Sequence, residues 1–129
     1  MNLLLDTQIV LRWLNGDLFP KRLVTQIEKA GSLAVSMVTP WEITIKTSRH
    51  QTQKLISAAQ LSEGLTQMGA RLLHIQRKHM ERLATLPEHH HDPFDRMLIA
   101  QAIEEKMTCV SSDDRFPLYK PSGLQLLWK

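Results

Sequence analysis

The chain has 129 residues, of which 43% are hydrophobic and 22% are charged, and its 16 basic and 13 acidic residues give a formal net charge of +3. This length and composition fit one domain over residues 1–129 and exclude an intrinsically disordered chain. A single cysteine, Cys109, excludes an internal disulfide and a zinc site built on cysteine pairs, and it favours a reducing compartment. The short apolar run before Asp6 has no basic region ahead of it, so we expect neither a signal peptide nor a membrane span, and a cytoplasmic protein.

Five short apolar runs are candidates for strands buried in a parallel sheet. They cover residues 2–6, 33–36, 71–75, 108–111 and 124–128. Helical periodicity predicts helices at 9–14, from 20 to a stop at Gly31, from 39 onward, at 57–68, at 78–86 and at 95–107, with loops at 48–54 and 87–93. Strands that alternate with helices predict right-handed crossovers, and therefore one α/β domain with a mostly parallel sheet covered by helices on both faces.

Two of the helix starts share one pattern: a capping residue, a proline, an aromatic residue and an acid. The pattern occurs as TPWE at 39–42 and as DPFD at 92–95. Proline disfavours the α conformation in the residue before it and suits the first helical position. We therefore expect Thr39 and Asp92 to be N-caps, and Glu42 and Asp95 to be the third residues of their helices.

Four acids fall where parallel strands end or where the following helices begin. Asp6 ends the first strand, and Glu42 lies in the first turn after the second. Asp95 opens the helix that leads into the fourth strand, and Asp113 lies just beyond that strand. Ligands of open α/β sheets bind outside the carboxyl ends of the strands, so these acids are candidates for one site.

Four carboxylates in a small space repel one another unless a cation neutralises them. Oxygen ligands favour Mg²⁺ or Mn²⁺, which bind phosphate oxygens and stabilise the charge that develops in phosphodiester cleavage. Without these four acids, the chain keeps nine acids against 16 bases, a balance of +7. An acidic metal pocket in a basic surround suits a nucleic acid.

Each acid also has a purely structural alternative. Glu42 and Asp95 would stabilise the N-terminal dipoles of their helices by about 0.3–1 kcal/mol each. Asp113 would act as a turn residue or cap in SSDDRF. Asp6 is the hardest to explain in this way, because a carboxylate that closes a buried strand is costly unless it is compensated.

Taken together, these residues resemble the PIN-domain family, and specifically the VapC-like ribonuclease toxins of type II toxin–antitoxin systems. The resemblance covers nearly the whole chain. It rests on four segments in order, each carrying one of the acids: MNLLLDT with Asp6, WEITIK with Glu42, HDPFDRMLIAQA with Asp95 and VSSDDRF with Asp113.

The resemblance implies a PIN-like single domain with a parallel sheet of about five strands. It also implies a Mg²⁺- or Mn²⁺-dependent endoribonuclease with an RNA substrate, frequent homodimerisation and a cognate antitoxin that restrains it. By position, the four acids match the family's catalytic and metal-binding quartet, and Ser111 falls where a hydroxyl often assists. The implied reaction is hydrolysis, in which one or two metal ions activate a water for in-line attack on phosphorus.

Three basic residues next to the acids in sequence are candidates for phosphate contacts, namely Arg96, Arg115 and Lys46. The chain also departs from the resemblance in two places. Gln8 stands where many relatives have histidine, which puts in doubt a substrate contact but leaves the acids untouched. Thr39 and Pro40 stand where serine followed by an aliphatic residue is more usual.

The histidines of PEHHHDP, His89, His90 and His91, invite a zinc interpretation because histidine is a good zinc ligand. Adjacent histidines rarely face one metal, so we expect them to be exposed in a loop where they touch RNA or a partner. We also expect the tryptophans to pack in the core or an interface rather than to stack on bases; these are Trp13, Trp41 and Trp128.

Two other classes of protein remain alternatives. A Mg²⁺-dependent phosphatase or a phosphoacceptor receiver domain would also carry acids at strand ends, although a receiver needs an acidic pair after its first strand and only Asp6 is present there. A catalytically inactive PIN-like module that binds RNA or protein is the non-enzymatic alternative. Metal-dependent cleavage of RNA would discriminate between these classes.

Overall fold

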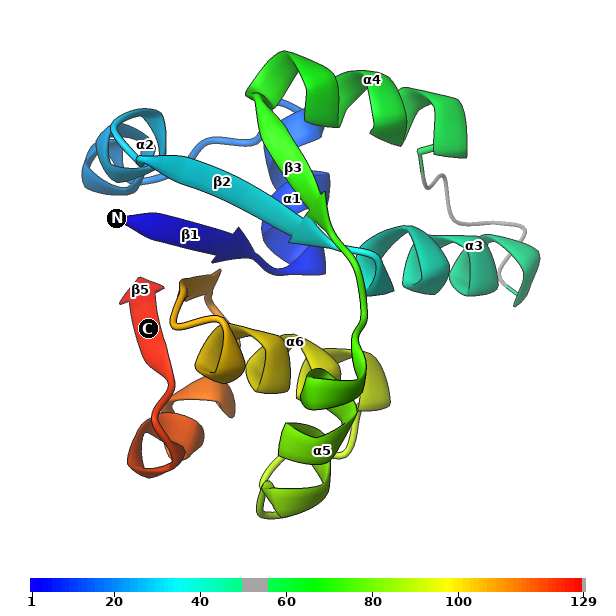
Figure 1. The fold of residues 1–129 in the computed structure, drawn as a ribbon. Helices are drawn as coiled ribbons and strands as arrows, with labels where there is room; N and C mark the ends of the chain where they lie inside the picture. The colour runs from blue at the N-terminus through cyan, green and yellow to red at the C-terminus, as the bar shows by residue number, and fades with distance from the viewer. Residues whose placement is uncertain (50–55, 129) are drawn as a thin grey trace.

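The structure is a computed structural model that describes residues 1–49 and 56–128. Within these residues, five parallel strands form one sheet in the order β3-β2-β1-β4-β5. The strands are β1 (Asn2–Leu5), β2 (Ser32–Ser36), β3 (Ala70–Leu73), β4 (Thr108–Ser111) and β5 (Gln125–Trp128). The helices are α1 (Thr7–Leu14), α2 (Lys21–Glu28), α3 (Val38–Arg49), α4 (Ala58–Met68), α5 (Arg77–Thr85), α6 (Pro93–Glu104) and the 3₁₀ helix η1 (Phe116–Ser122) (Figure 1).

The chain builds the sheet outward in two directions from the central strand β1. It first adds β2 and β3 on one side, and after α5 and α6 it returns to add β4 and β5 on the other. Leu5 therefore pairs with Val35 of β2 and with Val110 of β4. The strand order reverses between β1 and β4, and ligands of open α/β sheets bind at such a switch point, beyond the carboxyl ends of the strands.

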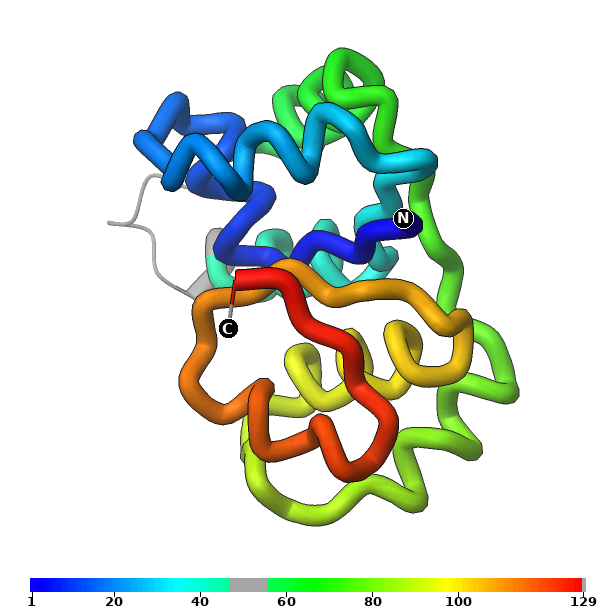
Figure 2. Tube along the Cα trace, turned by 90° about the vertical axis from the view of Figure 1, so that its left-hand side faces the viewer, coloured from blue at the N-terminus to red at the C-terminus, as the bar shows by residue number. Residues whose placement is uncertain are grey.

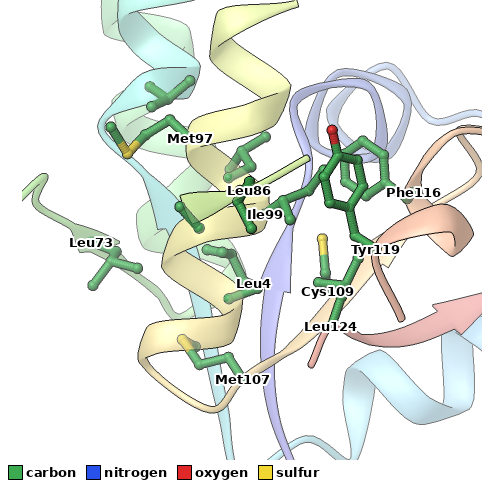
Figure 3. Packing of buried hydrophobic residues seen from close by; sticks show 14 of the residues in the cluster. Leu4, Leu73, Leu86, Met97, Ile99, Met107, Cys109, Phe116, Tyr119 and Leu124 are labelled. Atoms are coloured by element: carbon green, nitrogen blue, oxygen red, sulfur yellow. The ribbon is translucent and has the colours of Figure 1, made fainter. Parts of the chain in front are cut away.

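Helices cover both faces of the sheet, with α2 and α4 on one side and α5, α6 and η1 on the other (Figure 2). Because both faces are covered, Leu3, Leu4 and Leu5 are all fully buried, which explains the continuous apolar run of β1. Leu3 and Leu5 pack with the cores of α1, α2 and α4, whereas Leu4 joins the cluster of α6 and η1 (Figure 3). Among the described helices, none has the length and apolar character needed to cross a bilayer.

The predicted α/β class, the strands and most helices are confirmed, with ends shifted by one to three residues. The helix opened at Pro20 ends at Glu28, ahead of Gly31. The predicted strand 71–75 is β3, which ends at Leu73. The helix predicted at 95–107 covers Pro93–Glu104, and the sequence pattern did not reveal η1 at all.

The start of α3 differs from the prediction in a way that matters for the site. The helix begins at Val38, so Thr39 lies inside it and is not the N-cap. The Val38 N–H instead donates to Ser36 Oγ at 3.0 Å, and Thr39 Oγ1 lies 3.0 Å from Thr7 Oγ1 in a buried hydrogen bond between α3 and α1. Of the loop predicted at 48–54, residues 48 and 49 belong to α3 and the remainder lies outside the described residues.

Candidate active site

Asp6 lies directly beyond β1 and serves as the N-cap of α1. Its Oδ1 accepts from the Ile9 N–H at 2.8 Å, and its own N–H donates to the Val110 carbonyl at 3.1 Å. The side chain is buried, and the hydroxyl of Ser111 is a further hydrogen-bond partner. Asp6 is therefore fixed between the two central strands, exactly at the switch point of the sheet.

Glu42 reaches the same edge of the sheet from α3, where it is the fifth helical residue and not the third as predicted. Its Oε2 lies 2.6 Å from Lys46 Nζ, one helical turn away. Its Oε1 is buried and has no hydrogen-bond partner within the described part of the protein. A buried carboxylate oxygen without a partner is costly, and it is the kind of atom that a bound cation or water satisfies.

Asp95 and Asp113 form the third and fourth corners of the site. Asp92 is the N-cap of α6, as predicted: its Oδ1 accepts from the Phe94 N–H at 2.8 Å, which makes Asp95 the third helical residue. Asp113 follows β4, and its Oδ1 accepts from the Arg115 N–H at 2.8 Å. Of the two aspartates in DPFD, Asp92 therefore caps the helix, whereas Asp95 faces the other acids of the site.

His90 joins these two acids, and its position corrects the prediction that the loop histidines are exposed. Its side chain is buried, whereas His89 and His91 are exposed. His90 Nε2 lies 3.1 Å from Asp113 Oδ2 and 3.2 Å from Asp95 Oδ2. Its Nδ1 accepts from the Asp92 N–H at 3.2 Å, which leaves the proton of a neutral ring on Nε2, pointing at the two carboxylates.

The hydroxyl of the buried Tyr119 holds the loop that carries His90. It accepts from the His90 N–H at 2.9 Å and from Arg96 Nη1 at 3.1 Å, and it donates to the Pro87 carbonyl at 2.8 Å. Arg96 also donates to the Pro87 carbonyl at 2.8 Å, so its guanidinium is used to fix this loop. These bonds have no local sequence signal, because they join η1 to a loop about thirty residues earlier.

The remaining candidates lie around the acids. Ser111 is buried, and its Oγ accepts from the Asp113 N–H at 3.1 Å while its hydroxyl bonds Asp6. Lys46 is partly exposed and Arg115 is exposed, so both cationic side chains reach solvent near the site. Gln8 is exposed on α1.

Burial and mutual repulsion raise the pKa of two of the acids. Burial raises the pKa of Asp6 to about 6, and the charges of Asp113 and Glu42 add to the effect. Burial also raises the pKa of Asp95 to about 8, followed by the charges of Asp92, Glu42 and other acids of the site. All four carboxyl groups thus act on one another, and a divalent cation would relieve the repulsion.

The donor set fits a hard divalent cation. It consists of carboxylate oxygens, one of them buried and without a partner, and the ligand atoms of His90, Asp95 and Asp113 lie within 4.8 Å of one another. His90 would have to move its proton to Nδ1 to become a ligand, at the loss of the bond from the Asp92 N–H. The geometry therefore favours carboxylates as ligands, with His90 as the donor that orients two of them.

Comparison with known proteins identifies the family to which this site belongs. The model of the PIN domain matches residues 3–120. The chain belongs to the PIN-domain family. No curated protein matches the sequence.

Solved structures that share this fold include toxin–antitoxin complexes and a toxin. The DNA-bound VapBC of Salmonella typhimurium superposes with a TM-score of 0.69 at 15% identity, covering 98% of this chain and 97% of that chain. VapBC2 of Rickettsia felis, bound to a DNA fragment from its promoter, gives 0.68 at 17% identity and covers 98% of both chains. VapC20 of Mycobacterium tuberculosis, a sarcin-ricin loop cleaving toxin, gives 0.58 at 17% identity and covers 95% of both. At these identities the likeness shows a shared fold.

The raised pKa of Asp95 predicts how the stability of the metal-free protein depends on pH. A carboxyl group whose pKa is higher in the folded state favours the fold while it is protonated. This contribution is fully present when the pH is below the ordinary pKa of 3.8, and it is lost as the pH rises through the folded-state pKa of about 8. Asp95→Asn should therefore match wild type near pH 4 and melt at a higher temperature near pH 9. Mg²⁺ should raise the melting temperature of wild type more at pH 8.5 than at pH 5.

Thermal unfolding followed by circular dichroism, in excess EDTA or in Mg²⁺, measures both effects. Glu63→Gln, which removes an exposed acid of α4, is the control and should follow wild type. Melting temperatures of wild type and Asp95→Asn that stay parallel from pH 4 to pH 9 would contradict the raised pKa.

Removal of the Tyr119 hydroxyl should loosen the loop that carries His90. Tyr119→Phe keeps the packing of the ring but leaves the buried His90 N–H without its acceptor. We expect a loss of about 1–3 kcal/mol in the free energy of unfolding and a weaker affinity for Mg²⁺. Urea unfolding and calorimetric titration measure these quantities, with the exposed neighbour Leu118→Ala as the control. Unchanged values for both would show that the hydroxyl does not position the loop.

Proposed function

We propose that this protein is a Mg²⁺- or Mn²⁺-dependent endoribonuclease, the toxin component of a type II toxin–antitoxin pair. The observation that carries the proposal is the set of four mutually repelling carboxyl groups at the switch point of a PIN fold, with Glu42 Oε1 buried and without a partner among the described residues. Such a set is costly to maintain for a purely structural purpose. It also argues against an inactive PIN-like binding module.

Asp6, Glu42, Asp95 and Asp113 would hold the ion or ions. When bound, a divalent cation activates water and stabilises the charge that develops on the phosphate oxygens. Ser111 fixes Asp6, and His90 fixes the orientation of Asp95 and Asp113 through its Nε2 proton. These contacts keep the carboxylates preorganised for the ion.

Two cationic side chains would bind the substrate backbone. Lys46 and Arg115 are at least partly exposed beside the acids, and they would contact phosphates of the RNA. Arg96 was a third candidate in the sequence, but its Nη1 is bonded to the Pro87 carbonyl and the Tyr119 hydroxyl. We therefore assign Arg96 to support of the loop and not to the substrate.

The toxin role and the partners rest on the similar structures, which are toxin–antitoxin complexes or, for VapC20, a toxin that cleaves the sarcin-ricin loop. We extend this role to the present chain: RNA as the substrate, a cognate antitoxin that covers the acids, a homodimer, and action in the cytoplasm. An antitoxin segment would suit the site by directing a basic side chain toward the carboxylates and an apolar helix into a groove.

Cleavage of RNA should require a divalent ion and the carboxylate of Asp6. Asp6→Asn removes a metal ligand, but asparagine remains a good N-cap, so the fold should be kept while cleavage is lost. Asp92→Asn is the matched control, because its capping role is also filled by asparagine and most cleavage should remain. Incubation of total RNA with Mg²⁺, Mn²⁺ or EDTA, followed by mapping of the new ends, measures the activity. Full cleavage by Asp6→Asn, or in excess EDTA, would reject the metal-dependent nuclease.

Expression of the protein without an antitoxin should slow bacterial growth. The physical reason is that an active ribonuclease with an accessible site cleaves cellular RNA, so growth should recover with Asp6→Asn at matched protein levels. Growth curves with quantified expression test this prediction, with Asp92→Asn as the control that stays toxic. Equal growth with wild type and Asp6→Asn would argue against the toxin role. It would not decide whether the protein is a nuclease, which the cleavage assay tests.

A further inference from the structure

An aromatic pair, of which one ring is exposed and the other is partly buried, stands beside the acids. Trp41 precedes Glu42 in α3, and Phe94 precedes Asp95 in α6. The two rings meet edge to face, with centroids 5.0 Å apart and an angle of 86° between their planes. Trp41 nevertheless remains 55% exposed, so of the two locations expected for it, the core and an interface, the core is excluded. The pair therefore links the first turns of the two helices that carry Glu42 and Asp95.

The other two tryptophans do not share this position. Trp13, near the end of α1, and Trp128, the last residue of β5, are partly buried, and each contacts the ring of Phe19. Trp41 is held by Phe94 alone among the aromatic contacts of the described residues. In an edge-to-face pair, Phe94 covers at most one face of the indole, and the 55% exposure of Trp41 leaves much of the positioned side chain open to solvent.

A large apolar ring at this place is costly in water, and it lies next to groups that suit a nucleic acid. Successive residues of a helix point about 100° apart, so Trp41 lies beside the carboxylate of Glu42 and not within the acid cluster. Lys46, on the same helix, shares the face of Glu42 and supplies a positive charge. An aromatic ring one residue from a candidate metal-binding carboxylate, on a helix whose Lys46 lies at that same carboxylate, is a combination that binds a nucleotide with its phosphate.

We propose that Trp41, held in place by Phe94, is a stacking platform for an unpaired nucleobase next to the phosphate that is cleaved. The proposal rests on the proposed nuclease function and adds to it a residue that contacts a base of the substrate. Bases within a duplex already stack on one another and do not offer a free face, whereas an unpaired base does. Because every base has such a face, the platform favours single strands and not one sequence.

The occupant that competes with a base is a protein surface, from an antitoxin or from a second copy of this chain. The position of the ring favours the base. Trp41 is adjacent in sequence to Glu42, so a nucleotide whose phosphate lies at the carboxylates brings its neighbouring base close to the ring. The experiment below separates the two occupants.

Binding is measured with an uncleaved complex, in which every protein carries Asp6→Asn to prevent hydrolysis. The probes are a labelled single-stranded oligoribonucleotide and a duplex of the same sequence, in Mg²⁺ and at one fixed salt concentration. Trp41→Ala should weaken the single-strand affinity roughly 5- to 150-fold and leave the duplex affinity unchanged. Trp41→Phe should keep most of the single-strand affinity, because phenylalanine also stacks on bases. Leu118→Ala, another half-exposed apolar side chain, is the matched control and should have no effect.

Steady-state cleavage with Asp6 intact supplies a readout that a loss of folding would not mimic. Trp41→Ala should raise KM for single-stranded RNA by a similar factor with little change in kcat, and Trp41→Phe should lie near wild type. Indole emission should be quenched on binding of the single strand, and the quenching should shrink in Trp41→Phe.

Three outcomes would overturn the inference. If wild type cleaves RNA and Trp41→Ala binds both probes like the control, the platform is rejected while the proposed function stands. If RNA affinity is unchanged but self-association or capture by a co-expressed antitoxin is lost, the ring belongs to a protein interface. If wild type cleaves no RNA with any divalent ion, the proposed function fails and the inference fails with it.

Discussion

A carboxylate that closes a buried strand must be solvated by the protein itself, and the rest of the structure depends on how this is done for Asp6. The Ile9 N–H and the Ser111 hydroxyl bond its side chain, and its N–H continues the pairing of β1 with β4. These contacts are available only because the strand order reverses at this point, where two parallel strands and the start of α1 converge. The same convergence brings Glu42, Asp95 and Asp113 within electrostatic range of Asp6, so the fold that buries the first acid also creates the repulsion among all four.

The second requirement is to fix two acids that lie on separate segments, Asp95 in α6 and Asp113 after β4. His90 does this with one nitrogen, and its other nitrogen is held by the Asp92 N–H. The loop that carries His90 is anchored in turn by the hydroxyl of Tyr119. The Tyr119 side chain belongs to the hydrophobic cluster that includes the buried residues of α6 (Figure 3). A fully buried tyrosine thus connects the core directly to the loop at the edge of the site.

The sequence predicted the strands, the location of the acids at one edge of the sheet, and Asp92 as the N-cap of α6, because each depends on local patterns: apolar runs, strand ends and the preference of proline for the first helical position. It failed for His90, for η1 and for the start of α3. The start of α3 is set by the Ser36 hydroxyl and by the bond between Thr39 and Thr7, and the position of His90 by a tyrosine 29 residues away. Such contacts between distant segments leave no periodicity in the chain. The sequence also left open whether Trp41 packs in the core or in an interface, because that choice depends on contacts between distant segments.

Magnitudes decide between the functional and the structural interpretation of Asp95. As the third residue of α6 it gains about 0.3–1 kcal/mol from the helix dipole. Against this gain stands a pKa raised from 3.8 to about 8, and each unit of such a shift corresponds to about 1.4 kcal/mol against the ionised form. The penalty exceeds the gain several-fold, so ionised Asp95 destabilises the metal-free fold. A residue that served only to start a helix would sit where its charge is solvated. Asp95 instead faces three other acids, an arrangement that becomes favourable only when a cation completes it.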